Sequence, residues 1–219
     1  MSLSSPKINN PCKKFIEFKG DSGVFQYYDK DNKKNVPLPY PLSFIVLDEL
    51  STIKGFNEAS GSGIYANEVH SVKNQTLNVR TFKGNNSISG LYSDIKDQIK
   101  SIGGKYCKSI YASLIHKDGS LELVNFQLTG AAFKAWIDKT MDTHQEIVVI
   151  SKTVEGKKGK VVYQMPVFTA ASMNDELRQG AIEMDQKLQE FLKAKKVEHK
   201  DDVQDHPADE AQPDGEEPF

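Results

Sequence analysis

Cysteine is scarce in this sequence of 219 residues, and the residues that usually build catalytic or metal centres are not grouped. The two cysteines, Cys12 and Cys107, are too few for a disulfide framework and lack the spacing of a metal site. The five histidines are scattered without ligand spacing. Motifs of serine and cysteine hydrolases, zinc peptidases and nucleobase deaminases are also missing. We therefore expect no catalytic residue, no metal and no cofactor, and a protein that is not an enzyme.

Two weaker patterns leave an enzymatic alternative open. The glycine-rich stretch 57–63 lacks the Lys-Ser/Thr ending of a phosphate-binding P-loop, which argues against a nucleotide site. The triplet Glu17-Phe18-Lys19 has the E-x-K form of some nucleases, but a match of three residues occurs often by chance. A metal-dependent nuclease is therefore the least favoured reading.

Long apolar runs are missing as well. No stretch approaches the ~18 residues that a membrane-spanning helix needs, and the polar N-terminus is not a signal peptide. These features predict no membrane partner and a location in the cytoplasm or an equivalent reducing compartment.

The charge is distributed unevenly along the chain. Residues 201–219 contain eight acidic residues and no Lys or Arg, so the rest of the chain has 28 basic and 22 acidic residues, a net charge of +6. A segment of this composition cannot bury enough apolar surface to fold, so we expect a disordered tail. A basic body with an acidic tail is typical of proteins that handle nucleic acid, although a tail of this kind can simply be solubilising.

The hydrophobic pattern predicts a mainly β protein with added helices. Period-2 alternation or apolar runs favour strands, and the Asp118-Gly119 turn favours a hairpin. Helical periodicity is expected at 91–102, around 131–137 and after an N-cap at Asn174. Numerous short strands with tight hairpins favour a compact barrel or sandwich. The expected strands are 12–19, 24–29, 42–50, 64–70, 76–83, 105–116, 121–128, 146–154 and 160–168.

Several expected strands place aromatic residues beside basic ones. Grooves that bind single-stranded nucleic acid combine cations for the phosphates with aromatic rings on which bases stack. In strand 105–116, Lys105 and Tyr111 share one face and Tyr106 and Lys108 the other, and alternation does not choose between them. The candidate DNA-binding residues are Lys13, Phe15, Lys19, Lys54, Arg80, Phe82, Lys105, Tyr106, Lys108, Tyr111, Lys157 and Lys158.

The C-terminal tip and parts of the body resemble a known family. The ending Glu216-Glu217-Pro218-Phe219, behind an acidic segment, resembles the tip of single-stranded DNA-binding proteins of bacteria and their phages. The stretches LPYPLSFIVLDEL, NVRTFKG, GLYSDIK and GGKYCKSIYASL resemble the phage branch. The resemblance implies an OB-fold-like antiparallel barrel followed by a C-terminal helix and the acidic tail. It also implies a tip that docks replication or recombination proteins through Asp214, Glu216, Glu217, Pro218 and Phe219.

These observations together predict a protein that binds and protects single-stranded DNA in replication, recombination or repair. We expect a flexible leader over 1–11, one binding domain over 12–196 and an interaction tail over 197–219. The chain has an N-terminal hairpin and extra helices that the bacterial proteins lack, so a monomer or dimer is as compatible as a tetramer. The alternatives are a strand-annealing or recombination-mediator protein and, in another class, a structural or adaptor protein that does not bind DNA.

Overall fold

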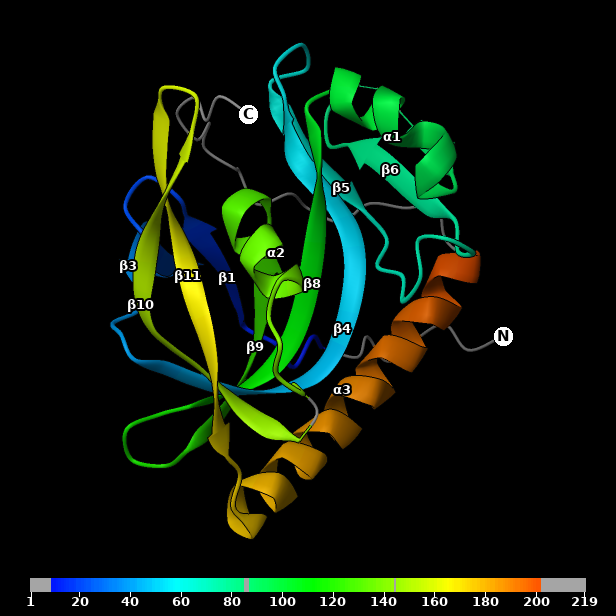
Figure 1. Cartoon of the computed structure of the whole chain (residues 1–219). Coiled ribbons are helices and arrows are strands. Elements are labelled where there is room, and N and C mark those ends of the chain that lie inside the picture. The colour runs from blue at the N-terminus through cyan, green and yellow to red at the C-terminus, as the bar shows by residue number, and fades with distance from the viewer. Residues whose placement is uncertain (1–8, 85–86, 144, 202–219) are drawn as a thin grey trace.

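The computed structural model describes residues 9–84, 87–143 and 145–201 (Figure 1). Over these residues the chain is mainly β with three helices, one of them C-terminal, as predicted. The segment that holds the predicted tail tip lies outside the described residues. In chain order the elements are β1 (Lys14–Lys19), β2 (Val24–Asp29), β3 (Lys34–Pro37), β4 (Leu42–Asn57), β5 (Ser62–Ala66), β6 (Leu77–Thr81), β7 (Ser87–Gly90), α1 (Tyr92–Ser101), β8 (Gly104–Ile115), β9 (Leu121–Leu128), α2 (Gly130–Ile137), β10 (Glu146–Lys158), β11 (Val161–Ser172) and α3 (Asp175–Asp201).

All described strands belong to one mixed sheet, and this sheet does not close into the antiparallel barrel that was expected. Its main path runs β3-β2-β1-β9-β8-β4-β5-β6-β7, with β10 beside β4 and β11 beside β10. The β1–β9 pair is parallel. The edge strand β11 reaches the β1–β2 turn through a backbone bond from Gln164 N–H to the Gly20 carbonyl (2.7 Å), without pairing as a strand.

The long strand β4 explains this open architecture. Its first residues pair with β10 and its last residues pair with β5, while β8 lies along its other edge. Along this edge of β4 the sheet therefore divides into two lobes, one with β10 and β11 at the start of β4 and one with β5, β6 and β7 at its end (Figure 1). The sequence predicted this strand only as far as Leu50, and the short strands β3 and β7 were not predicted.

One face of the sheet holds the main core. We call it the inner face; on β8 it carries Tyr106 and Lys108. Around one lobe, α2 and the β10–β11 pair enclose an aromatic cluster in which the Trp136 ring stacks on Phe44 and meets Phe168 edge-on. Around the other lobe, α1 packs Ile95 and Ile99 against the β4–β7 strands. The only Trp is fully buried, which agrees with its predicted role in the core.

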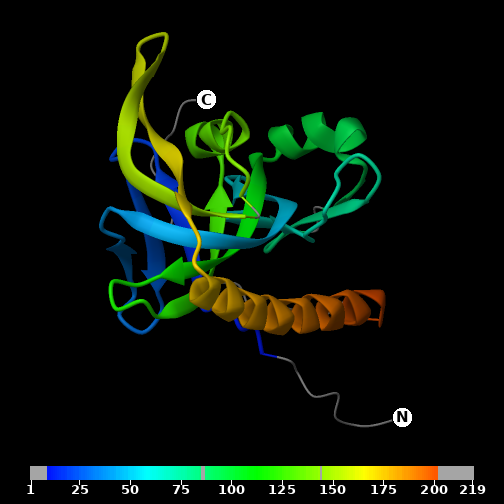
Figure 2. The same cartoon turned by 60° about the horizontal axis from the view of Figure 1, so that its bottom comes forward.

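The opposite, outer face carries Lys105 and Tyr111 on β8 and is covered only in part. Helix α3 lies across it, on the other side of the sheet from α1 and α2 (Figure 2). Leu188 and Leu192 of α3 pack against Leu50 and Tyr111 of the sheet. The helix begins as predicted, because the Asn174 side chain accepts a hydrogen bond from the Leu177 N–H (2.8 Å).

Candidate nucleic-acid interface

The residues on the inner face of β8 are engaged in packing and pairing. Lys108 lies 3.1 Å from the Glu49 carboxylate, and both side chains are largely buried. The same carboxylate accepts a hydrogen bond from the Trp136 indole N–H at 3.3 Å. The ring of Tyr106 lies between Tyr92 and Phe133, with centroids at 5.3 and 5.0 Å. Tyr106 and Lys108 therefore belong to the contact between the sheet and its helices, and they do not lie with Lys105.

Tyr111 was predicted as a binding residue but is 1% exposed. Its hydroxyl donates to Glu68 at 2.9 Å, and Lys195 of α3 lies 3.2 Å from the same carboxylate. Burial, followed by the neighbouring negative charge of Glu68, raises the pKa of the Tyr111 hydroxyl. A base cannot stack on a covered ring, so this assignment is wrong. Tyr111 is covered because α3, which is distant in the sequence, packs over this part of the outer face.

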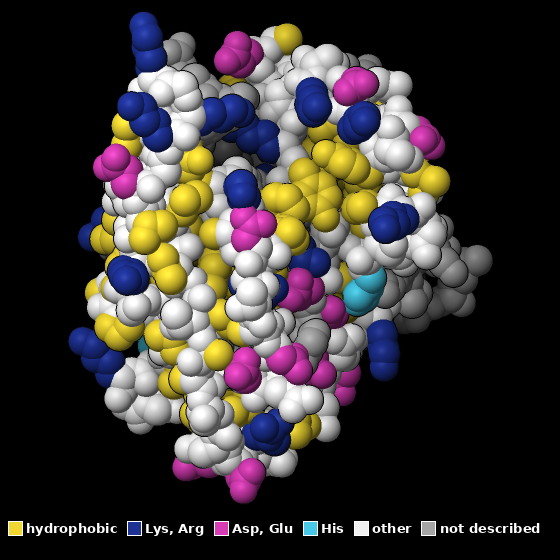
Figure 3. Space-filling model, in the orientation of Figure 1, with side chains coloured by type: hydrophobic (Ala, Val, Ile, Leu, Met, Phe, Trp, Pro, Cys, Tyr) yellow, Lys and Arg dark blue, Asp and Glu magenta, His cyan; other side chains and the backbone are white. Residues whose placement is uncertain are grey.

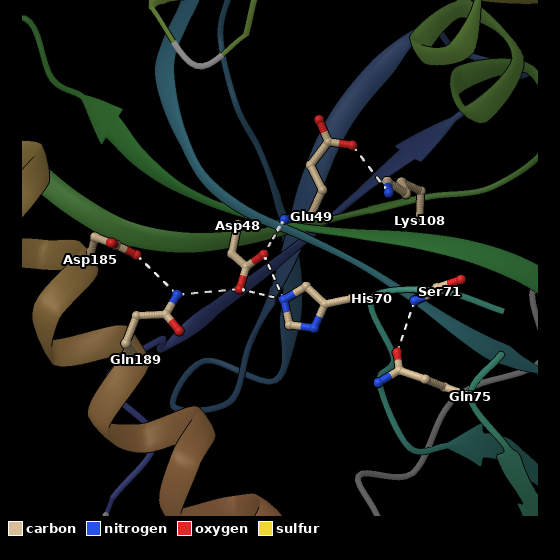
Figure 4. Close-up of polar contacts among 8 residues, drawn as sticks. All are labelled: Asp48, Glu49, His70, Ser71, Gln75, Lys108, Asp185 and Gln189. Carbon is tan, nitrogen blue, oxygen red and sulfur yellow. Dashed lines mark hydrogen bonds and ion pairs between the residues drawn. The ribbon is translucent and has the colours of Figure 1, made fainter. Parts of the chain in front are cut away.

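A second polar contact fixes α3 at this position (Figure 4). The Gln189 side chain donates to Asp48 at 3.3 Å, and the His70 ring lies 3.2 Å from the same carboxylate. Asp48 and Glu49 point to opposite sides of β4, which places the Lys108 pair and the α3 contact on different faces of the sheet (Figure 4). Together, Asp48 and Glu68 mark the border between the covered and the uncovered parts of the outer face.

Beyond this border, toward the C-terminal end of β4, three cations and an aromatic ring form a row across four adjacent strands. Lys105 on β8 pairs in register with Lys54 on β4, Lys54 with Tyr65 on β5, and Tyr65 with Arg80 on β6. Paired residues on neighbouring strands point to the same face, with strands ~4.8 Å apart, so the row spans about 14 Å. Phe82 lies two residues from Arg80 and shares its face; its N–H donates to the Gly63 carbonyl at 2.9 Å.

A second aromatic pair lies at the other end of the outer face. Ile16 on β1 pairs with Tyr27 on β2, so continuing this register by one residue places Phe15 opposite Tyr28. Among the described residues, the exposed large aromatic side chains are Phe15 (39%), Tyr28 (47%), Tyr65 (48%) and Phe82 (41%). All four lie on the outer face, which is the arrangement expected of a stacking surface rather than of scattered exposed rings.

Lys54 lies between the two ends of the outer face and contacts residues of β9 and β1. Its ammonium group donates to Gln127 on β9 at 2.8 Å and forms an ion pair with Glu17 on β1. Because β8 and β9 lie between β4 and β1 in the sheet, this contact reaches across the middle of the outer face. Cys107 lies fully buried on the same face, and burial raises the pKa of its thiol to about 12. The thiol is therefore protonated at neutral pH and contributes no charge to the surface.

The remaining predicted cations lie at the margins. Lys13 is exposed just before β1 and lines a shallow depression with Lys187 of α3, and Lys19 is half-buried at the end of β1. Lys157 and Lys158 are exposed on the β10–β11 hairpin, which stands apart from β5 and β6 (Figure 1). On the side of the molecule that carries α2, a hollow beside this hairpin holds several Lys or Arg side chains (Figure 3).

The structure thus brings Phe15, Lys54, Arg80, Phe82 and Lys105 onto one face. Sequence reasoning missed Tyr65 and Tyr28 on that face. Their strands were predicted, but neither ring has a basic residue two positions away on its own strand. Only the pairing of Tyr65 with Lys54 and Arg80 reveals its surroundings, and pairing across strands is not visible in local alternation.

Over the described residues, no three His, Cys, Asp or Glu side chains are grouped so that they could hold a metal ion. None of the described helices combines the length and the apolar character that crossing a membrane requires.

Comparison of the chain with protein-family models, curated proteins and solved structures found no match. The geometry of the outer face therefore carries the functional argument.

Proposed function

We propose that this protein binds single-stranded DNA, with little sequence preference, on the uncovered part of the outer face. The observation that carries the proposal is the grouping of the four exposed aromatic rings of the described residues with Lys54, Arg80 and Lys105 on one face. Cations neutralise the phosphates, and rings stack on bases without reading their hydrogen-bonding edges.

The proposal favours single strands for a physical reason. In a duplex the base faces are stacked on one another, so exposed rings gain nothing unless a base leaves the stack. A flexible single strand can place successive bases on Tyr65 and Phe82 and, farther along, on Phe15 and Tyr28. Stacking of this kind contributes ~1–3 kcal/mol per base.

DNA is favoured over other polyanions by the resemblance of the C-terminal tip to phage and bacterial single-stranded DNA-binding proteins. The curl of the sheet around one aromatic core is a feature that a partly open OB-like barrel would share. Recruitment of replication or recombination proteins through Asp214, Glu216, Glu217, Pro218 and Phe219 stays a prediction of that resemblance.

The test is a salt-titrated fluorescence anisotropy measurement with a labelled oligonucleotide, single-stranded or annealed to its complement. We expect tighter binding of the single strand and a steep loss of affinity with salt. Equal affinity for both forms, or no binding at low salt, would overturn the proposal. Acceleration of annealing in the same mixtures would assign the protein to the strand-annealing alternative.

A further inference from the structure

A carboxylate occupies the centre of the proposed binding face. Glu17 on β1 forms an ion pair with Lys54, and the two side chains are 38% and 30% exposed. Lys54 also donates to Gln127, so its ammonium group is held by two acceptors in the free protein. The cation best placed between the two aromatic pairs is therefore already engaged.

The position of Glu17 is unusual for this surface. Over the described strand positions of the outer face between Asp48 and the end of β4, and on the strands beside it, Glu17 is the one carboxylate, among basic, aromatic, aliphatic and uncharged polar residues. Cys107 beneath the pair is uncharged and cannot replace either partner. A phosphate approaching Lys54 meets a like charge at the place where it would bind, and like charges in contact oppose binding.

We propose that Glu17 holds Lys54 as an internal substitute for a phosphate, and that a DNA backbone must displace this carboxylate to bind. The inference rests on the proposed function and adds regulation to the same face. Glu17 then lowers the affinity of the face for every polyanion and favours ligands that also stack on the rings, because their stacking offsets the loss of the Glu17–Lys54 pair.

The magnitude follows from the exposure of the pair. Partly exposed ion pairs are weak, so removing the competitor changes affinity only modestly. We expect Glu17→Gln, which keeps the shape and removes the charge, to tighten single-strand binding about two- to fivefold at low salt, with a smaller gain at high salt.

The experiment is a double-mutant cycle on the full chain. Binding of a labelled single-stranded oligonucleotide is measured for the wild type, E17Q, K54M and the double variant E17Q/K54M. The matched control is Glu183→Gln, which removes one exposed carboxylate from α3. Thermal unfolding of each variant confirms that it is folded.

The inference predicts that E17Q tightens binding, that E183Q has at most a small effect, and that the gain from E17Q largely disappears when Lys54 is absent. If E17Q behaves like E183Q, or if its gain is the same in the K54M background, Glu17 acts only through net charge and the inference is wrong while the proposed function stands. If neither the wild type nor any variant binds single strands, the proposed function fails, and the inference with it.

Discussion

Replacing Phe82 or Tyr65 by alanine should weaken single-strand binding strongly while leaving the fold intact. Each ring is close to half-exposed, and each stacked base contributes ~1–3 kcal/mol. With 1.4 kcal/mol per tenfold change, either substitution should raise Kd by about 5- to 150-fold. The loss of stability should be smaller, about 1 kcal/mol, because only part of each side chain is buried.

The assay is fluorescence anisotropy at one fixed salt concentration, with thermal unfolding measured on the same preparations. Ile182→Ala is the control, because Ile182 is 47% exposed on α3 and has no ring. Phe82→Trp provides a rescue, since it keeps an aromatic surface of larger area. We expect weak binding by F82A and Y65A, and binding near the wild-type level by I182A and F82W.

The result that would refute the reasoning is specific. If F82A and Y65A bind as tightly as I182A, and all three are folded, the rings do not stack on bases and the outer face is not the site. If F82W is as defective as F82A although it is folded, the loss reflects local shape rather than stacking.

Further predictions follow from charge, packing and burial. Arg80→Gln and Lys105→Gln should each weaken single-strand binding and reduce the slope of log K against log salt by about 0.7, which a salt titration measures. Trp136→Ala should lower the free energy of unfolding by about 3–5 kcal/mol in denaturant titrations, without changing the affinity of the folded fraction, because this ring is buried on the inner face. Cys107 should resist alkylation until the protein unfolds, since at pH 8 a thiol with a pKa of about 12 is ionised in only about 1 molecule in 10⁴. Mass spectrometry after treatment with an alkylating reagent measures this, and rapid labelling of the native protein would contradict the burial of Cys107.

Local alternation predicted which residues of β8 share a face, but it could not say which face is available. Lys105 and Tyr111 do lie on one side, and Tyr106 and Lys108 on the other. Whether a side chain on that side meets solvent depends on α3, which follows β8 by some sixty residues and packs over Tyr111 while leaving Lys105 exposed. The helix itself was predicted from its cap and apolar stripe, but a helical stripe does not specify the strands that it covers.

Strand pairing was a second feature that the sequence could not predict. The prediction ended β4 at Leu50, because the apolar run ends there. The strand continues to Asn57 because β5 and β8 supply hydrogen-bonding partners on both sides of this polar stretch. That extension carries Lys54 to the middle of the candidate site. Lys54 was predicted to bind DNA, but its neighbours Tyr65 and Glu17 come from strands whose register no sequence pattern reveals.

The composition of the outer face supports the proposal that its uncovered part is a binding surface. Where that face continues onto β6 and β7, Asn78, Ser87 and Ser89 are polar and exposed, as solvent-facing strand positions usually are. The rings of Tyr65 and Phe82 interrupt this rule on neighbouring strands. Single exposed rings are ordinary, but two pairs on one face, beside three cations, leave apolar area in water of the kind that marks an interaction surface. Since α3 is held at the border by Glu68 and Asp48, it leaves these rings uncovered, and the partner that we propose for them would come from outside the described part of the fold.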